Sequence, residues 1–260
     1  MIKLTRQKEI ENIVKGRDFV AIADIPSMLN CSISTIRRDI KEMESRGLLT
    51  QSQGVVIWKA KTLEQEKQHE IIYHYRQGQN ADIKRQLGTY AAKFVEENDT
   101  LFLDTGTTML ELAKSLPDIP LSIVTNDLRI AIELENKFNI STIVLGGFVR
   151  RGTHTVIGDI GSVLDSFHFQ KTFFSPAGID TAGGFMFLNL QAMEVRTKAK
   201  AASEKCVMVA DHTKFGKKGF IKGFELNDCD LLITDMFPSD AGIDWESFLT
   251  GKVDDLRSFD

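Results

Sequence analysis

The sequence predicts a small helical N-terminal domain followed by a larger α/β domain with a mainly parallel sheet. Residues 1–58 hold three short segments with apolar residues at helical spacing and then a hairpin pattern. From residue 81 onward, helical segments alternate with short apolar strands, which is typical of parallel sheets covered on both faces. At 260 residues and 42% hydrophobic, the chain is long enough for both domains. We therefore expect a first domain over 1–58, a partly helical linker over 59–80 and a second domain over 81–260.

The first domain is predicted to begin with two short helices. One spans Thr5–Gly16, and the other lies within Val20–Asn30, where Pro26 suits a helix start. After Gly47, two apolar segments flank a polar tip, which indicates a small hairpin. A third helix is predicted between these two helices and the hairpin. Three helices followed by a hairpin is the order of a winged helix-turn-helix, in which one helix enters the DNA major groove.

The third predicted helix, Cys31–Glu44, carries the strongest functional signal. Its apolar residues recur every three or four positions and form one stripe that packs on the domain: Ile33, Ile36, Ile40 and Met43. The residues that we expect to contact DNA lie on the other side, and they are Ser32, Ser34, Thr35, Arg37 and Arg38. Arginine binds guanine edges or phosphates bidentately, and short hydroxyls contact either. The alternative for this helix alone is an amphipathic surface helix with solvated arginines.

Charge and composition are compatible with this interpretation. The net charge is −4, which alone argues against nucleic acid, but residues 1–60 carry ten Lys/Arg and seven Asp/Glu. A basic head on an acidic body suits a protein in which only the head contacts DNA. Three widely spaced cysteines without CxxC spacing favour reduced thiols. No apolar run approaches the ~20 residues that span a bilayer, and no secretory signal is apparent, so we expect a cytoplasmic protein.

The second domain is predicted as an alternating series of helices and strands. Helices are expected at Ile83–Glu97, Met109–Leu116 and Leu128–Lys137. Strands are expected at Thr100–Leu103, Leu121–Val124, Ser141–Leu145, Lys171–Ser175, Cys206–Ala210 and Leu231–Thr234. In open α/β sheets, ligands bind beyond the carboxyl ends of the strands. The loops that follow these strands are therefore the candidate site.

Four of those loops are polar, glycine-rich or both: Asp104–Thr108, Thr125–Asp127, Gly146–Gly152 and Asp211–Lys218. The first leads directly into a helix, so free amides and a glycine form a natural anion cradle there. Each loop alone is more often a helix cap, but four at one sheet edge favour a binding site. Neither GxGxxG nor the Walker A pattern occurs, which disfavours dinucleotides and P-loop nucleotides. The histidines lack a metal-binding i, i+4 pair, so we expect neither a metal nor a cofactor.

Motifs in both domains resemble the DeoR family of bacterial transcriptional regulators. They are Ser34–Ile40 with Gly47–Leu49 in the head, and Leu103–Thr108, Val124–Asn126, Leu145–Gly147, Gly178–Asp180 and Asp211–Gly216 in the body. The resemblance implies a Rossmann-like sensor domain similar in fold to ribose-5-phosphate isomerase that senses phosphorylated sugars. It implies that Gly106, Thr107 and Thr108 hold the phosphate. It also implies that the sugar end is lined by Asp104, Asn126, Gly147, Asp211 and Lys214, with Glu194 nearby. The hairpin departs from the family because Thr50, Gln51 and Gln53 stand where basic residues or His are expected.

The resulting hypothesis is a transcriptional repressor of a carbohydrate operon whose operator binding is modulated by a phosphorylated sugar. It requires at least a homodimer, because one short helix reads too few base pairs. One alternative is a sugar-phosphate isomerase-like enzyme with a DNA-binding head, using Asp104, Asp211 or Glu194 as base. Another is a protein-interaction module. No base is visibly paired with an orienting partner, so we expect no catalytic residue. The charges at Glu194, Arg196, Lys198 and Lys200 are expected to form a solvated helix face.

Overall fold

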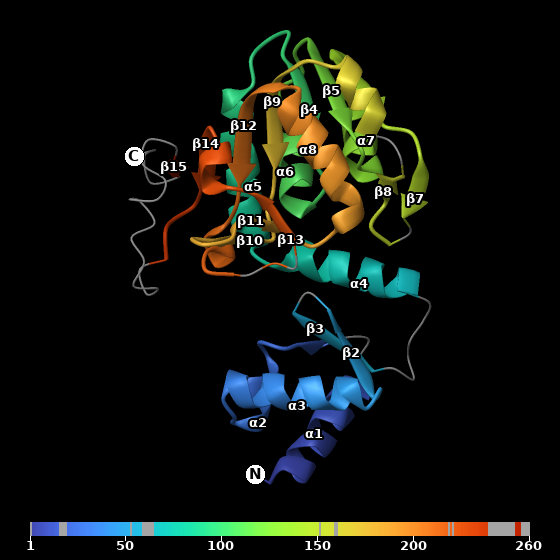
Figure 1. Cartoon of the computed structure of the whole chain (residues 1–260), viewed down its shortest axis with the longest axis vertical. Helices are drawn as coiled ribbons and strands as arrows, with labels where there is room; N and C mark the ends of the chain where they lie inside the picture. The colour runs from blue at the N-terminus through green and yellow to red at the C-terminus, as the bar shows by residue number, and fades with distance from the viewer. Residues whose placement is uncertain are drawn as a thin grey trace. The chain divides into compact units, whose positions relative to one another are not determined.

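The computed structural model describes residues 2–15, 20–52, 54–58, 65–150, 152–158, 161–217, 219, 221–238 and 253–255. The chain forms two compact units (Figure 1). The N-terminal unit contains Met1–Gly78 with Arg151–Thr153, and the C-terminal unit contains Gln79–Arg150 with His154–Asp260.

The N-terminal unit has the predicted three helices and hairpin. The helices are α1 (Lys3–Lys15), α2 (Ile25–Leu29) and α3 (Ile33–Ser45), and the hairpin strands are β2 (Leu49–Ser52) and β3 (Val55–Trp58). A two-residue strand that periodicity cannot detect, β1 (Val20–Ala21), pairs antiparallel with β3 to complete a three-stranded sheet. Helix α4 (Gln65–Gly78) occupies most of the predicted linker. The fold class of the head is therefore confirmed.

The apolar stripe of α3 packs into the core of the head, with one exception. Ile36, Ile40 and Met43 are fully buried against residues of α1, α2 and the hairpin. Ile33, which we predicted to belong to the stripe, is 38% exposed. It occupies the first position of the helix, at the end of the stripe, so its inclusion was wrong.

The C-terminal unit is built on a seven-stranded sheet of order β15-β14-β12-β9-β4-β5-β6, in which every neighbouring pair is parallel. The strands are β4 (Thr100–Leu103), β5 (Leu121–Thr125), β6 (Ile140–Val144), β9 (Phe169–Phe174), β12 (Ser203–Val209), β14 (Leu231–Thr234) and β15 (Val253–Asp255). Its helices are α5 (Ala81–Ala91), α6 (Thr107–Ser115), α7 (Leu128–Leu134) and α8 (Met193–Ala201). The predicted parallel α/β architecture is confirmed, and β15 is a strand that the sequence did not indicate.

Shorter elements surround this sheet. Strands β7 (Phe148–Arg150) and β8 (Thr155–Ile157) form a hairpin, while β10 (Gly178–Asp180), β11 (Gly184–Phe187) and β13 (Ile221–Phe224) form a small antiparallel sheet. Five 3-10 turns complete the described elements: η2 (Ala92–Phe94), η3 (Gly161–Ser166), η4 (Leu190–Ala192), η5 (His212–Lys214) and η6 (Leu226–Asp228).

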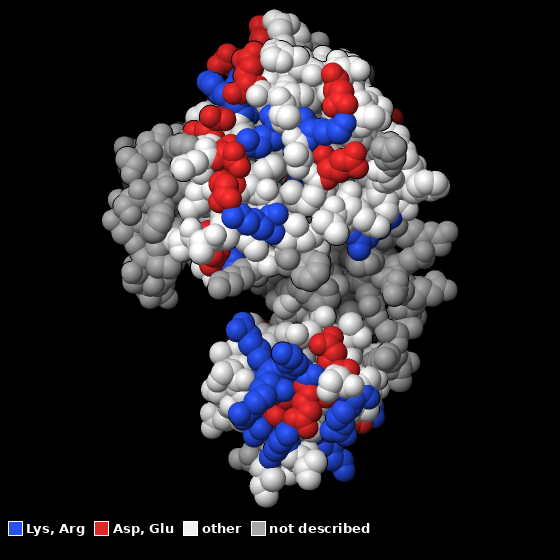
Figure 2. Space-filling model, in the orientation of Figure 1, with Lys and Arg blue, Asp and Glu red and all other residues white. Residues whose placement is uncertain are grey.

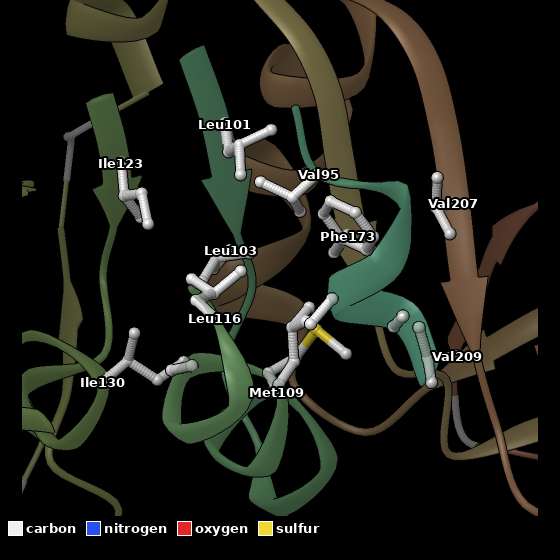
Figure 3. Close-up of a cluster of buried hydrophobic side chains, with 14 of the residues drawn as sticks. Val95, Leu101, Leu103, Met109, Leu116, Ile123, Ile130, Phe173, Val207 and Val209 are labelled. Carbon is white, nitrogen blue, oxygen red and sulfur yellow. The ribbon is translucent and has the colours of Figure 1, made fainter. Parts of the chain in front are cut away.

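Successive strand residues pack on opposite faces of the large sheet, as the pleat requires. Leu101 and Leu103 join α5, α6 and α7 in one buried cluster, and Figure 3 shows Met109 and Ile130 pointing into it. Phe102 packs on the other face, in a cluster that includes α8 and the small sheet. Both faces are covered, so the carboxyl ends of the strands are where polar loops gather.

Two further properties of the described chain bear on the earlier expectations. All three cysteines are free thiols, and burial raises the pKa of Cys206. Across the described ranges, no helix has the length and apolar character needed to cross a membrane.

Candidate DNA-binding face and effector site

The predicted DNA-contacting residues lie at the start of α3. Ser32 caps the helix, because its Oγ accepts a hydrogen bond from the Thr35 amide at 3.3 Å. The same Oγ lies 3.0 Å from Ser34 Oγ and 2.8 Å from Thr35 Oγ1. Ser32 and Ser34 are exposed and Thr35 is half-buried, so a cluster of hydroxyls stands at the helix entry.

The two predicted arginines, Arg37 and Arg38, are both exposed on the next turn of α3. Within the described residues, neither forms an ion pair or a hydrogen bond. Figure 2 shows lysine and arginine side chains gathered on the visible face of the head. Both guanidinium groups are thus available for phosphates or base edges.

A third arginine of the head has a structural role that the sequence analysis missed. Arg6 of α1 forms a buried ion pair with Asp39 of α3, whose side chain is 0% exposed. This bond raises the pKa of Arg6. The sequence did indicate that Asp39 is buried, because it lies three residues after Ile36 and therefore on the apolar side of the helix. The pair fixes α3 against α1 and thereby orients Arg37 and Arg38.

In the C-terminal unit, Asp104 follows β4 and is 0% exposed. Its Oδ2 accepts a hydrogen bond from Arg196 Nε of α8 at 2.8 Å. Arg196 also reaches Thr105 Oγ1 at 3.5 Å and lies 4.5 Å from the centre of the Phe187 ring. The second carboxylate oxygen of Asp104 is buried with no partner among the described residues. Unpaired buried acceptors are costly, so this oxygen is a natural contact for a ligand hydroxyl.

Arg196 was predicted to belong to a solvated charged face, and that prediction was wrong. Its side chain is 6% exposed, because α8 turns it toward the end of β4 rather than toward water. Lys198 follows the prediction more closely, since it pairs with exposed Asp165 at 2.7 Å.

The loop after Asp104 leads into α6 through Gly106. This residue has φ +133°, a conformation that favours glycine, and as the N-cap of α6 it makes no side-chain hydrogen bond to the first turn of the helix. Thr107 and Thr108, which follow, are both buried. The positive end of the helix therefore begins at a glycine beside two hydroxyl groups, an arrangement that suits an anion.

The Gly106 amide donates a hydrogen bond to Asp127 Oδ2 at 3.3 Å, which joins the first loop to the second. Asp127 caps α7 through its Oδ1, which accepts from the Arg129 amide at 2.9 Å. Burial raises the pKa of Asp127 to about 6, although these amide bonds and the charge of Arg129 oppose the shift. Asp127 therefore gains or loses its negative charge at about pH 6, next to the start of α6.

Asn126 directly follows β5, as Asp104 directly follows β4. The last residues of these two neighbouring strands, Leu103 and Thr125, are paired. Asn126 Nδ2 donates to the Val156 carbonyl at 3.2 Å. Its Oδ1 is buried without a partner among the described residues. Two adjacent strands thus each end in a buried polar side chain with a free acceptor.

Asp211 and Lys214 form a second group at the end of β12. Asp211 is buried, and its Oδ1 accepts from the Thr213 amide at 3.0 Å and from Asn80 Nδ2 at 3.1 Å. Lys214 Nζ lies 4.0 Å from Asp211 Oδ2. Burial favours the neutral acid, but the charge of Lys214 and the bonds from Thr213 outweigh it and lower the pKa of Asp211. Asp211 is therefore ionised at neutral pH.

Two predicted effector residues stand apart from these contacts. Gly147, with φ +147°, is exposed in the turn between β6 and β7. Glu194 is exposed in the first turn of α8.

A further polar pair was not predicted. Nδ1 of His212 lies 2.5 Å from Asp235 Oδ2, and the His212 amide donates to Asp235 Oδ1 at 2.6 Å. In the described parts of the chain, no group of His, Cys, Asp and Glu side chains could hold a metal ion.

A winged head with exposed arginines and a parallel α/β domain with buried polar strand ends define a DNA-binding regulator that carries its own sensor domain. Residues 6–62 match the DeoR-like helix-turn-helix domain, and residues 79–236 match the DeoR C terminal sensor domain. The chain belongs to the DeoR family of transcriptional regulators.

Several proteins with similar sequences are named as transcriptional regulators or repressors. The chain is 32% identical to an uncharacterized HTH-type transcriptional regulator, YulB, of Bacillus subtilis, over 90% of both chains. It is 32% identical to the lactose phosphotransferase system repressor of Streptococcus mutans, over 90% of this chain and 93% of that one. Ribose-5-phosphate isomerase A of Methanocaldococcus jannaschii aligns with a TM-score of 0.39 and 12% identity, over 52% of this chain and 55% of that one. The two sequence relatives, each 32% identical to this chain, are named as transcriptional regulators rather than enzymes.

Proposed function

We propose that this protein represses a carbohydrate-metabolism operon and that a phosphorylated sugar modulates its binding to the operator. The observation that carries the sensor half is the start of α6, whose N-cap is Gly106, beside buried Asp104, which has one oxygen without a partner in the described part of the chain. The helix start suits a phosphate, and the free acceptors of Asp104 and Asn126 suit sugar hydroxyls. The names of relatives, such as the lactose phosphotransferase system repressor of Streptococcus mutans, support a carbohydrate role.

In this proposal, Gly106, Thr107 and Thr108 hold the phosphate. The sugar end is bound by Asp104, Asn126, Gly147, Glu194, Asp211 and Lys214. The head binds the operator through Ser32, Ser34, Thr35, Arg37 and Arg38. The boundaries 1–58, 59–80 and 81–260 divide head, linker and sensor.

The protein is proposed to act in the cytoplasm as a homo-oligomer. A single recognition helix reads only a few base pairs, so an operator of useful specificity needs two heads on repeated or palindromic half-sites. At least a dimer is therefore expected on the DNA.

The substitution Thr107→Val tests the phosphate site. Valine is close in shape to threonine but lacks the hydroxyl, so the effector response of operator binding should disappear while binding without effector stays intact. Operator binding is measured by fluorescence anisotropy with and without sugar phosphate.

Thr142→Val is the matched control, because Thr142 lies on edge strand β6 and its hydroxyl has no partner among the described residues. It should respond like the wild type. A full response from Thr107→Val would mean that the phosphate binds elsewhere.

A further inference from the structure

Asn80 lies where the sensor unit begins. The N-terminal unit ends at Gly78, where α4 also ends, and α5 begins at Ala81. Asn80 has φ +51° and ψ +38°, so the chain turns in the left-handed region between the two helices. The Asn80 carbonyl accepts the first hydrogen bond of α5, from the Lys84 amide at 2.9 Å. Any movement of Asn80 therefore moves the junction between α4 and α5.

The Asn80 side chain does not cap its own helix. Asparagine at this position usually accepts a hydrogen bond from an amide of the first turn, but no such bond forms here. Instead, Nδ2 of Asn80 donates to Asp211 Oδ1 at 3.1 Å. Asn80, the second residue of the C-terminal unit, is thus hydrogen-bonded to a carboxylate 131 positions later in the chain.

A second contact holds the same junction. Lys84 is buried, and its Nζ donates to the Gln79 carbonyl at 2.6 Å. The positive charge of Lys84 also favours the ionised form of Asp211. Gln79 and Asn80, the two residues between α4 and α5, are therefore both held by the cluster around Asp211.

We propose that Asn80 is a positioning residue for Asp211 and that the Asn80–Asp211 hydrogen bond couples effector occupancy to the α4–α5 junction. The inference rests on the proposed function, since it takes Asp211 and Lys214 as effector ligands. A sugar phosphate that engages them changes the charge and the hydrogen bonds around the Asp211 carboxylate. The strength of the hydrogen bond from Asn80 Nδ2 to Asp211 Oδ1 then differs between the free and the occupied sensor domain. Such a difference is what allosteric coupling requires, and its reciprocal effect on effector affinity follows from linkage.

The test uses Asn80→Gly in the full-length protein. Glycine adopts φ +51° without strain, so the substitution removes the hydrogen bond and leaves the backbone turn acceptable. Operator affinity is measured by fluorescence anisotropy without effector and with glucose-6-phosphate, fructose-1-phosphate and ribose-5-phosphate. Effector binding is measured separately by calorimetry. A purely structural role would weaken both kinds of binding together, whereas a coupling role removes only the response.

Asn98→Gly is the matched control, because Asn98 also has positive φ, +69°, but precedes β4 in a different loop. A second variant, Asn80→Asp, keeps a polar side chain but places a carboxylate against Asp211. If either Asn80 variant fails to fold, the other decides.

The wild type and Asn98→Gly should respond to effector by about 5–150-fold in operator affinity. Both Asn80 variants should still bind operator and effector but lose most of that response. An undiminished response in Asn80→Gly would overturn the coupling role while leaving the proposed function intact. A wild type that ignores every sugar phosphate would contradict the proposed function and this inference with it.

Discussion

Removing the positive charge of Arg196 should destabilise the sensor unit strongly, because it would leave Asp104 as a buried carboxylate without a partner. Arg196 Nε is the donor to Asp104 Oδ2, and Asp104 Oδ1 already has no partner among the described residues. Arg196→Met keeps a long apolar stem against Phe187 and deletes the guanidinium group. The substitution therefore removes the contacts of the guanidinium group while it keeps the packing of the stem.

The expected magnitude follows from burial. Asp104 and Arg196 have side chains exposed by 0% and 6%, so water cannot replace the lost donor. Breaking a buried pair by removing one partner costs about 3–5 kcal/mol in unfolding free energy. The lost contact of the guanidinium with the Phe187 ring, 4.5 Å away, adds about 0.5–2 kcal/mol. For a unit of this size, the pair alone corresponds to a fall in Tm of about 6–20 °C.

Urea unfolding followed by circular dichroism measures this cost, and Lys198→Met provides a control on the same helix. Lys198 pairs with Asp165, but both side chains are substantially exposed. Exposed pairs contribute about 0–1 kcal/mol, so Lys198→Met should change stability little. The double variant Asp104→Asn, Arg196→Met should recover part of the loss, because it removes the unpaired charge. Equal and small effects of the two single substitutions would refute the buried-pair argument.

Two further predictions concern the head and the second loop. Arg37→Ala should cost about 1–3 kcal/mol of operator binding if the guanidinium reads a base, and an equal loss on random DNA would make it a phosphate contact. For Asp127, the folded pKa of about 6 lies above the ordinary value of 3.8, so its contribution to stability is full at low pH and falls as pH rises through 6. Between pH 5 and 8 this contribution falls by about 1 kcal/mol, and Asp127→Asn should remove that part of the pH dependence of urea unfolding. A pH profile identical to that of the wild type would contradict the raised pKa.

Much of the fold follows from periodicity in the sequence. The six strands of the large sheet between Thr100 and Thr234 have four to seven residues each, and the apolar segments within them predict a parallel sheet covered on both faces. Edge strand β6 is less buried than this pattern predicts, because Ile143 and Val144 are 40% and 38% exposed. The stripe of Ile36, Ile40 and Met43 likewise defines α3. Ile33 shows what periodicity cannot predict. The spacing places it on the apolar side of α3, but spacing does not indicate whether the first turn of the helix is covered by the other elements of the domain.

The site was less predictable because its key contacts join distant segments. Asp104 and Arg196 are 92 positions apart, and Asn80 and Asp211 are 131 apart. Nothing local distinguishes Arg196 from the charged residues around it on α8. Asp39 is the informative exception, since its position within the apolar stripe already indicates a buried acid that needs a partner.

The central claim, that one chain joins operator binding to a sugar-phosphate signal, is tested most directly by fluorescence anisotropy on labelled DNA from upstream of its own operon. Glucose-6-phosphate, fructose-1-phosphate and ribose-5-phosphate are titrated in, with the unphosphorylated sugars and a scrambled DNA as controls. We expect one phosphate to shift specific binding while its parent sugar does not, and we expect affinity to fall with salt as counterions are released. Specific binding that no phosphate changes would contradict the sensor role, and binding that does not distinguish the two DNAs would contradict the account as a whole.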